Sequence, residues 1–462
     1  MGARYSLFAL LLFVLISQVL AEKYWYSFWP KNIANSHKND NPAAGEPEDN
    51  AAFDKMLKKD AINVGSCVWK SSDSVGGATW YWTAQMERDV AHEKYGDMKF
   101  FELVVPFEDE DGTPPESPPV RRSRAHPRKV KRGEEGEVYQ AYPPAPLEFL
   151  SRPEGVHKQE LFGYDASAGK GVRVYVVDTG VNKDSPGWIN GDDRKPDYLF
   201  AEPFSKHEEI DLDDEDGHGS CMADLAVGQW NGVAKRADLT SVQVDDFSDE
   251  LRTLMSYEIN LDALVKIADD FEDKGLGWGK AVLLLPFGWP DPLTSNRGKV
   301  FDKAYFTMLE ALNRRGIAIV TSLSNYNGEG GCKAPPCIYG DPDNAPRYLP
   351  EIITVGEAWV DDGSYADEED DRLSWTTIYG PGNDGKDGPD RDKGIKCLGP
   401  EGTEYDNIQQ GTSVGKYFLS LTCFRANISS CFVRCWSHGL LQGFGSRSCS
   451  RPTAAFGFCL QA

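Results

Sequence analysis

The 462-residue sequence predicts an α/β fold in which a parallel sheet carries helices on both faces. Three continuous apolar runs support this fold: Gly171–Asp178 (GVRVYVVD), Ala281–Leu285 (AVLLL) and Ile317–Thr321 (IAIVT). Strands that are buried on both faces read as such runs, whereas half-exposed strands alternate. Helical spacing at Asn260–Phe271 and Phe301–Arg314 separates the runs. Strands that alternate with helices favour a parallel sheet, in which reactive residues gather at the carboxyl ends of the strands.

The N-terminal 21 residues predict a secretory signal peptide. Arg4 precedes an apolar run of 14 residues from Leu7 to Leu20, and Val19 and Ala21 occupy the small-residue positions of a cleavage site. The alternative is a membrane anchor, but a spanning helix needs about 20 apolar residues. We therefore expect no membrane association of the mature chain and a secreted product, with the vacuole as the alternative destination.

Residues 22–108 predict a small α+β domain. Its expected elements are strand Lys23–Pro30, helix Asp49–Ala61, strands Ser66–Lys70 and Ala78–Trp82, helix Thr83–Tyr95 and strand Met98–Val105. The order β-α-β-β-α-β is the split βαβ, ferredoxin-like pattern. Because that fold serves many functions, the pattern alone assigns none.

Residues 109–145 predict a linker, because acids and prolines lead into a basic run without apolar periodicity. The run Arg121–Arg132 holds seven basic residues in twelve. It can be a solvated tether or a nucleic-acid patch. The pairs Arg121-Arg122 and Lys131-Arg132, between two folded parts of a secreted chain, favour a third interpretation, cleavage by a dibasic processing protease.

The composition excludes some classes of partner and of structure. It has 49 Lys and Arg against 72 Asp and Glu, a formal net charge of −23, so we expect no nucleic-acid partner. Hydrophobic residues make up 40% of the chain, which excludes global disorder. Ten cysteines are enough for a few disulfide bonds in an oxidising compartment.

Four polar residues follow predicted strands or have a glycine close by in the sequence. Asp178 closes a buried strand, His218 lies in DGHGS, Asn325 follows the IAIVT strand, and Ser413 lies in GTS. Together they supply the groups that acyl transfer needs. Histidine can take the proton of a serine hydroxyl near neutral pH, and a buried carboxylate fixes the tautomer of the histidine. A side-chain amide can donate to the developing oxyanion.

The order Asp, His, Ser in these contexts resembles the subtilisin-like serine proteases, and among them the proteinase K-like branch. The resemblance covers about 155 to 415 and rests on YDASAGKGVRVYVVDTGV at 164–181, DGHGSCMADLAVGQWNGVAKRADLTSVQV at 216–244 and GTS at 411–413. It implies that Asp178, His218 and Ser413 form a catalytic triad, that Asn325 contributes to the oxyanion hole, and that the chemistry needs no cofactor.

The resemblance also implies a domain plan. Residues 146–415 would be the catalytic domain, in which Leu285–Gly288 and Ser322–Ser324 line the pocket for the substrate residue that precedes the scissile bond. Residues 22–108 would be a ferredoxin-like propeptide that inhibits the protease and assists its folding. The expected product is a secreted serine endopeptidase and a monomer, with protein or peptide substrates and its own propeptide as partners.

Structural alternatives stay open for these residues. Asp178 could cap a turn, His218 could be a structural histidine, Asn325 could be a turn residue and Ser413 could cap a helix. The acidic run Asp211–Asp216 does not fit the EF-hand spacing and favours a solvated loop, with a structural calcium ion as the alternative. Spacing would allow a local bridge between two further residues, Cys332 and Cys337, without establishing it.

The sequence departs from the family pattern after Ser413. Where the family continues with Met-Ala-Ala-Pro, this chain reads Val414-Gly415-Lys416-Tyr417, and residues 407–462 contain no Asp or Glu. Our hypothesis is that 416–462 is a non-family tail, translated from an intron; a genuine divergent Cys-rich tail is the alternative. If the catalytic domain is truncated there, the alternative function is an inactive pseudoprotease or a propeptide-type inhibitor.

Overall fold

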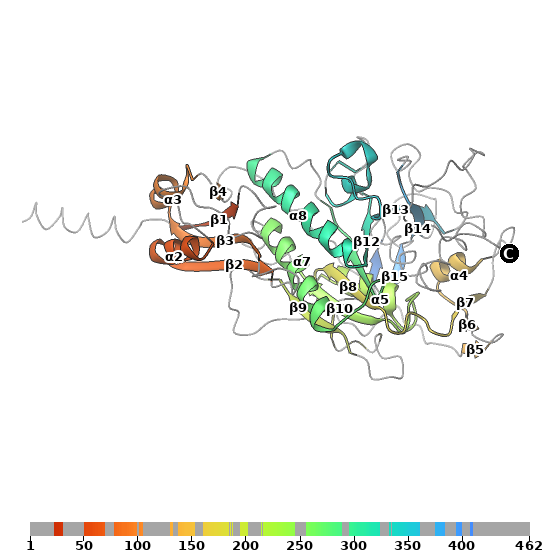
Figure 1. The fold of residues 1–462 in the computed structure, drawn as a ribbon. Helices are drawn as coiled ribbons and strands as arrows, with labels where there is room; N and C mark the ends of the chain where they lie inside the picture. Colours follow the sequence, from red (N-terminus) through yellow and green to blue (C-terminus); the bar gives the residue numbers. More distant parts are fainter. Residues whose placement is uncertain are drawn as a thin grey trace, which may run out of the picture.

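The computed structural model contains an N-terminal α+β domain and a larger α/β domain (Figure 1). It describes residues 23–30, 50–69, 78–98, 101–104, 130–132, 137–152, 160–183, 185, 187, 195–201, 214, 216–244, 256–288, 295–323, 332–333, 335–360, 375–383, 394–399 and 407–409. The predicted signal peptide and the tail 416–462 lie outside these residues. Within the described part of the chain, no helix combines the length and hydropathy needed to cross a membrane.

A seven-stranded sheet forms the centre of the α/β domain. Its strand order is β14-β13-β12-β11-β8-β10-β9, and every neighbouring pair runs parallel. The strands are β8 (Arg173–Asp178), β9 (Asp197–Phe200), β10 (Asp238–Gln243), β11 (Ala281–Leu285), β12 (Ile317–Ser322), β13 (Ile353–Trp359) and β14 (Ile378–Asn383). This sheet confirms the parallel α/β fold predicted for the larger part of the chain.

Helices cover both faces of this sheet. On one face α7 (Ser256–Asp273) and α8 (Asn296–Arg314) pack together, and α5 (His218–Val227) packs on the other (Figure 1). Alternate residues of β8 divide between the two cores: Tyr175 and Val177 face α7 and α8, whereas Val174 and Val176 face α5. Because both sets are buried, the strands contain continuous apolar runs.

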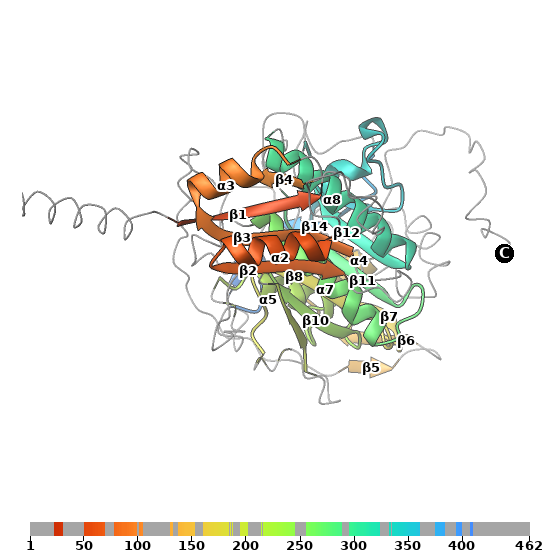
Figure 2. The ribbon, with the colours of Figure 1, turned by 60° about the vertical axis from the view of Figure 1, so that its left-hand side comes forward.

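The N-terminal domain is a four-stranded antiparallel sheet with order β2-β3-β1-β4. Its elements are β1 (Lys23–Pro30), α2 (Asn50–Asp60), β2 (Asn63–Trp69), β3 (Ala78–Glu87), α3 (Arg88–Tyr95) and β4 (Phe101–Val104). Figure 2 shows α2 and α3 in front of the sheet, on the side away from α7 and α8. The element order is the split βαβ order expected from the sequence.

One prediction within this domain is wrong. Residues 83–87 were expected to begin a helix, but they continue β3, and Thr83 to Glu87 pair with β1 from Ser27 to Lys23. Ala, Gln, Met and Glu favour helices, but this intrinsic preference is weak, and the pairing with β1 overrides it. The helix α3 therefore begins at Arg88.

The opposite face of the N-terminal sheet packs against the α/β domain. Trp29, Cys67 and Tyr81 belong to the same buried cluster as residues of α7 and α8. The Tyr81 hydroxyl donates a hydrogen bond of 2.8 Å to the carbonyl oxygen of Glu258 in α7. The two domains therefore share one buried cluster at their contact, while α2 and α3 form a separate core on the other face of the N-terminal sheet.

The segment predicted as a linker contains structure that sequence reasoning missed. β5 (Val130–Arg132) pairs antiparallel with β6 (Glu137–Ala141), and β6 pairs with β7 (Leu161–Asp165). Helix α4 (Ala145–Ser151) follows β6. The basic pair Lys131-Arg132 thus lies in an edge strand, whereas Arg121-Arg122 lies outside the described residues.

Candidate active site

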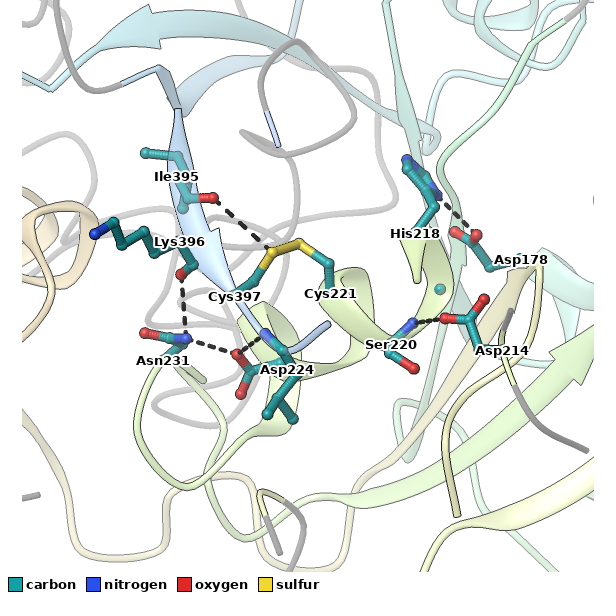
Figure 3. Close-up of a disulfide and its surroundings, with 12 residues drawn as sticks. Asp178, Asp214, His218, Ser220, Cys221, Asp224, Asn231, Ile395, Lys396 and Cys397 are labelled. Carbon is teal, nitrogen blue, oxygen red and sulfur yellow. Dashed lines mark hydrogen bonds and ion pairs between the residues drawn. A yellow bond between two sulfur atoms is a disulfide. The ribbon is translucent and has the colours of Figure 1, made fainter. Parts of the chain in front are cut away.

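The fold brings Asp178 and His218 into contact. Asp178 is the last residue of β8, and His218 is the first residue of α5, which lies against that strand. The Nδ1 atom of His218 lies 2.7 Å from Oδ1 of Asp178 (Figure 3). The Asp178 side chain is 3% exposed and that of His218 is 26% exposed. A carboxylate can only accept, so Nδ1 carries the proton and Nε2 is left as the basic nitrogen.

The surrounding charges tune this histidine. Burial lowers the pKa of His218, but the charge of Asp178 and its hydrogen bond raise it, and Asp216 and Asp214 add to the rise. The pKa of His218 ends above its ordinary value. A raised pKa makes His218 a stronger base toward a hydroxyl proton, and it requires a higher pH before the base is free.

A second carboxylate, Asp214, holds the start of α5 next to Asp178. Its Oδ2 accepts from the amide of Ser220 at 2.6 Å, and its Oδ1 accepts from the amide of Gly217 at 3.0 Å. The Thr179 hydroxyl donates to Oδ1 of Asp214 at 2.7 Å and accepts from the amide of Gly219 at 3.0 Å. A negative charge at a helix N-terminus is stabilising, because the first amides lack partners within the helix.

Two glycines permit this approach. Gly217 precedes α5 with φ 82°, in the left-handed region that only glycine adopts at low cost. Gly219 lies against the turn after β8, where an added β-carbon would be 2.0 Å from the carbonyl oxygen of Gly180. A side chain at position 219 would displace α5 from Asp178, and a side chain at position 217 would strain the backbone where α5 begins.

The other two predicted site residues, Asn325 and Ser413, lie outside the described residues. A described strand ends a few residues before each of them. β12 ends at Ser322, three residues before Asn325, and it is separated from β8 by β11 alone in the sheet. The last described strand, β16 (Asn407–Gln409), ends four residues before Ser413.

The predicted pocket segments are described in part. Leu285 and Ser322 end the neighbouring strands β11 and β12, and both are buried. Phe287 is half-buried and Gly288 is exposed, and Ser324 lies outside the described residues. The segments after β11 and β12 therefore begin at the same edge of the sheet that carries Asp178.

The acidic run 211–216 was expected to form a solvated loop, and for one residue this is wrong. Asp214 is 1% exposed, and its carboxylate accepts hydrogen bonds from Thr179, Gly217 and Ser220. Asp216 is exposed, and its carboxylate accepts from the amide of His218 at 3.1 Å. Among the described residues, no three His, Cys, Asp or Glu side chains gather as a metal site.

Two disulfide bonds are present in the described part of the chain. Cys332 bonds to Cys337, the bridge that the spacing allowed. Cys221 of α5 bonds to Cys397 of β15 (Ile395–Cys397), 176 residues away in sequence. Sequence reasoning missed the second bridge, because no local signal connects cysteines so far apart.

Comparisons with known proteins show the family of this chain. A model of the subtilase family matches residues 169–415. The curated Subtilisin-like protease 6 of Trichophyton equinum is 26% identical over 223 residues, which are 48% of this chain and 46% of that protein. Subtilisin-like protease 2 of Trichophyton rubrum is 36% identical over 195 residues, 42% of this chain and 38% of that protein.

These pairings span less than half the length of either relative. Among solved structures, that of a cold-adapted subtilisin-like serine proteinase superposes with a TM-score of 0.42 at 17% identity. The superposition covers 65% of this chain and 87% of that one.

Proposed function

This chain belongs to the subtilase family of serine peptidases, and we propose that it is a secreted endopeptidase with the triad Asp178, His218 and Ser413. The observation that carries the proposal is the 2.7 Å contact between His218 and a buried Asp178 at the carboxyl edge of the parallel sheet. Because the Nδ1 proton of His218 is donated to Asp178, Nε2 is unprotonated and can take the proton of a serine hydroxyl.

The proposed reaction proceeds by acyl transfer. Ser413 attacks the peptide carbonyl while Nε2 of His218 removes its proton, and the Asp178 carboxylate stabilises the imidazolium that forms. Asn325, with backbone amides, donates hydrogen bonds to the oxyanion. His218 then returns the proton to the leaving amine. Water next attacks the acyl carbonyl while His218 takes its proton, the bond to the Ser413 oxygen breaks, and His218 returns the proton to that oxygen.

Residues 22–108 act, in this proposal, as a propeptide. The N-terminal sheet buries Trp29, Cys67 and Tyr81 against α7 and α8, so it contributes core to the α/β domain and stabilises it. Processing at the basic pairs in 109–145 would separate the two parts, and residues 1–21 would direct the chain to secretion. We further propose substrates that are peptides or proteins, and a monomeric enzyme without a catalytic cofactor.

We also propose that the tail 416–462 is translated from an intron. The transcript sequence across codons 410–420 tests it, since an uninterrupted transcript that continues to Ala462 contradicts intron origin.

Hydrolysis of a quenched fluorescent peptide library by the full chain tests the proposed activity. Wild type should cleave, Ser413→Ala should lose turnover entirely, and Ser420→Ala, a control seven residues downstream, should retain it. Turnover that persists in Ser413→Ala would refute the assignment of the nucleophile. Absence of turnover in wild type would favour a binding or inhibitory role.

A further inference from the structure

The helix that carries His218 is fastened to β15 at several points (Figure 3). Cys221, three residues after His218, is disulfide-bonded to Cys397. One turn further, Oδ2 of Asp224 accepts a hydrogen bond of 3.2 Å from the backbone amide of Leu398. Residues three apart are neighbours on a helix surface, so Cys221 lies one turn from His218 on one side and one turn from Asp224 on the other.

Asn231 closes this arrangement from the loop after α5. Its Nδ2 donates to Oδ2 of Asp224 at 2.6 Å and to the carbonyl oxygen of Lys396 at 3.2 Å. We call Cys221, Asp224, Asn231 and Cys397 the α5–β15 clamp. Its members join α5 to three consecutive residues of one short segment, 396–398.

All four members of the clamp are buried: Cys221, Asp224 and Cys397 are 0% exposed and Asn231 is 2% exposed. Burial raises the pKa of Asp224 to about 7, against opposing hydrogen bonds from Asn231 and Leu398 and the charge of Lys235. Removing a carboxyl group from water costs free energy, so a buried carboxyl group is a weak source of stability. The directional hydrogen bond to the Asp224 carboxyl group and the adjacent disulfide constrain the position of α5 relative to β15 more narrowly than an apolar contact would.

The partner of α5 leads toward the predicted nucleophile. β15 pairs antiparallel with β16, with Cys397 opposite Asn407 and Ile395 opposite Gln409. β16 also contacts α5, and it ends four residues before Ser413. One ladder of hydrogen bonds therefore connects the bridge on the His218 helix to β16, which precedes Ser413 by four residues in the sequence.

We propose that the α5–β15 clamp positions His218 relative to Ser413. The inference rests on the proposed function, because it treats His218 and Ser413 as partners in one proton transfer. The clamp members are positioning residues, since they act through α5 and the β15–β16 ladder. Without the bridge, only the hydrogen bonds of Asp224 and Asn231 join α5 to β15, so the two elements move more freely relative to each other and the base meets the hydroxyl less often in reactive geometry.

The full chain with Cys221→Ser and Cys397→Ser tests the proposal against a matched control, Cys332→Ser with Cys337→Ser. We expect the clamp variant to lose about 10- to 100-fold in kcat per titrated active site, with KM within about twofold of wild type. The control should keep kcat within about twofold. A purely structural bridge would lower the concentration of titrated sites and leave kcat per site unchanged, and that result overturns the proposal.

A second variant keeps the test open if the double substitution prevents folding. Asn231→Ala retains the disulfide and removes two clamp hydrogen bonds, so kcat should fall in the same direction, by about 3- to 10-fold. Unchanged kcat in a folded Asn231→Ala protein overturns the proposal as well.

Hydrogen exchange separates failure of the clamp from failure of the proposed function, because it needs no turnover. In the clamp variant the amides of 218–227 and 407–409 should exchange at least about tenfold faster, while those of α7 keep the wild-type rate. If wild type lacks turnover but shows this pattern, the protease assignment fails and the mechanical coupling stands. Unchanged exchange in both segments overturns the coupling.

Discussion

Replacing Gly219 by alanine tests whether activity depends on the contact between α5 and the end of β8. The added β-carbon would lie 2.0 Å from the carbonyl oxygen of Gly180 and 3.1 Å from Cβ of Asp178, whereas ordinary contact begins at 3.4 Å. The helix must therefore move away from the turn by about 1 Å or more. A shift of that size takes the 2.7 Å contact between His218 and Asp178 beyond hydrogen-bond distance.

Such a displacement should lower kcat/KM of Gly219→Ala by about 10²- to 10⁴-fold, because 1 Å of misplacement costs about 10²-fold and loss of the dyad about 10⁴-fold. The free energy of unfolding should fall by about 1–3 kcal/mol. Gly277→Ala is the control, since no heavy atom lies within 4 Å of its added β-carbon. The assay is peptide hydrolysis well below the melting temperature, with folding checked by circular dichroism. A folded Gly219→Ala protein with kcat/KM within threefold of wild type would refute the reasoning.

Three further predictions concern the same groups. Asp178→Asn should lower kcat about 10⁴-fold in a folded protein, because the wrong histidine tautomer results; a kcat near wild type contradicts the triad. Asp214→Asn removes a charge that raises the pKa of His218, so the free base appears at lower pH. The acidic limb of its kcat/KM profile should shift to lower pH, and an unmoved or raised limb contradicts the coupling. Tyr81→Phe deletes the hydrogen bond to Glu258, so hydrogen exchange in β3 should report about 0.5–1.5 kcal/mol less protection, with α5 as the internal reference. Equal protection of β3 in both proteins would contradict a role for that bond.

The parallel sheet could be predicted because its strands are buried on both faces and read as apolar runs. β11 begins and ends at the residues expected, Ala281 and Leu285. Residues 83–87 were misassigned because their helix formers are held in β3 by pairing with β1, a contact distant in sequence. β9 escaped prediction because DYLF is too short for periodicity to register.

The candidate site was predicted only as far as its motifs extend. Asp178 and His218 lie in contact as expected, since the end of a buried strand and a glycine-flanked histidine both leave local signals. The role of Asp214 has no such local signal, because an acidic run by itself predicts a solvated loop. Only the tertiary structure shows that Asp214 is buried. The bridge between Cys221 and Cys397 likewise depends on packing between α5 and β15, which no spacing rule contains.

Active-site labelling tests the central claim most directly, that the Asp178–His218 pair activates Ser413. The full chain is treated with a fluorophosphonate, digested and mapped by mass spectrometry. We predict a single phosphonylated residue, Ser413, whose labelling rate falls by at least about 10³-fold in His218→Ala. Labelling at another residue, or equal rates at Ser413 in both proteins, would contradict the account.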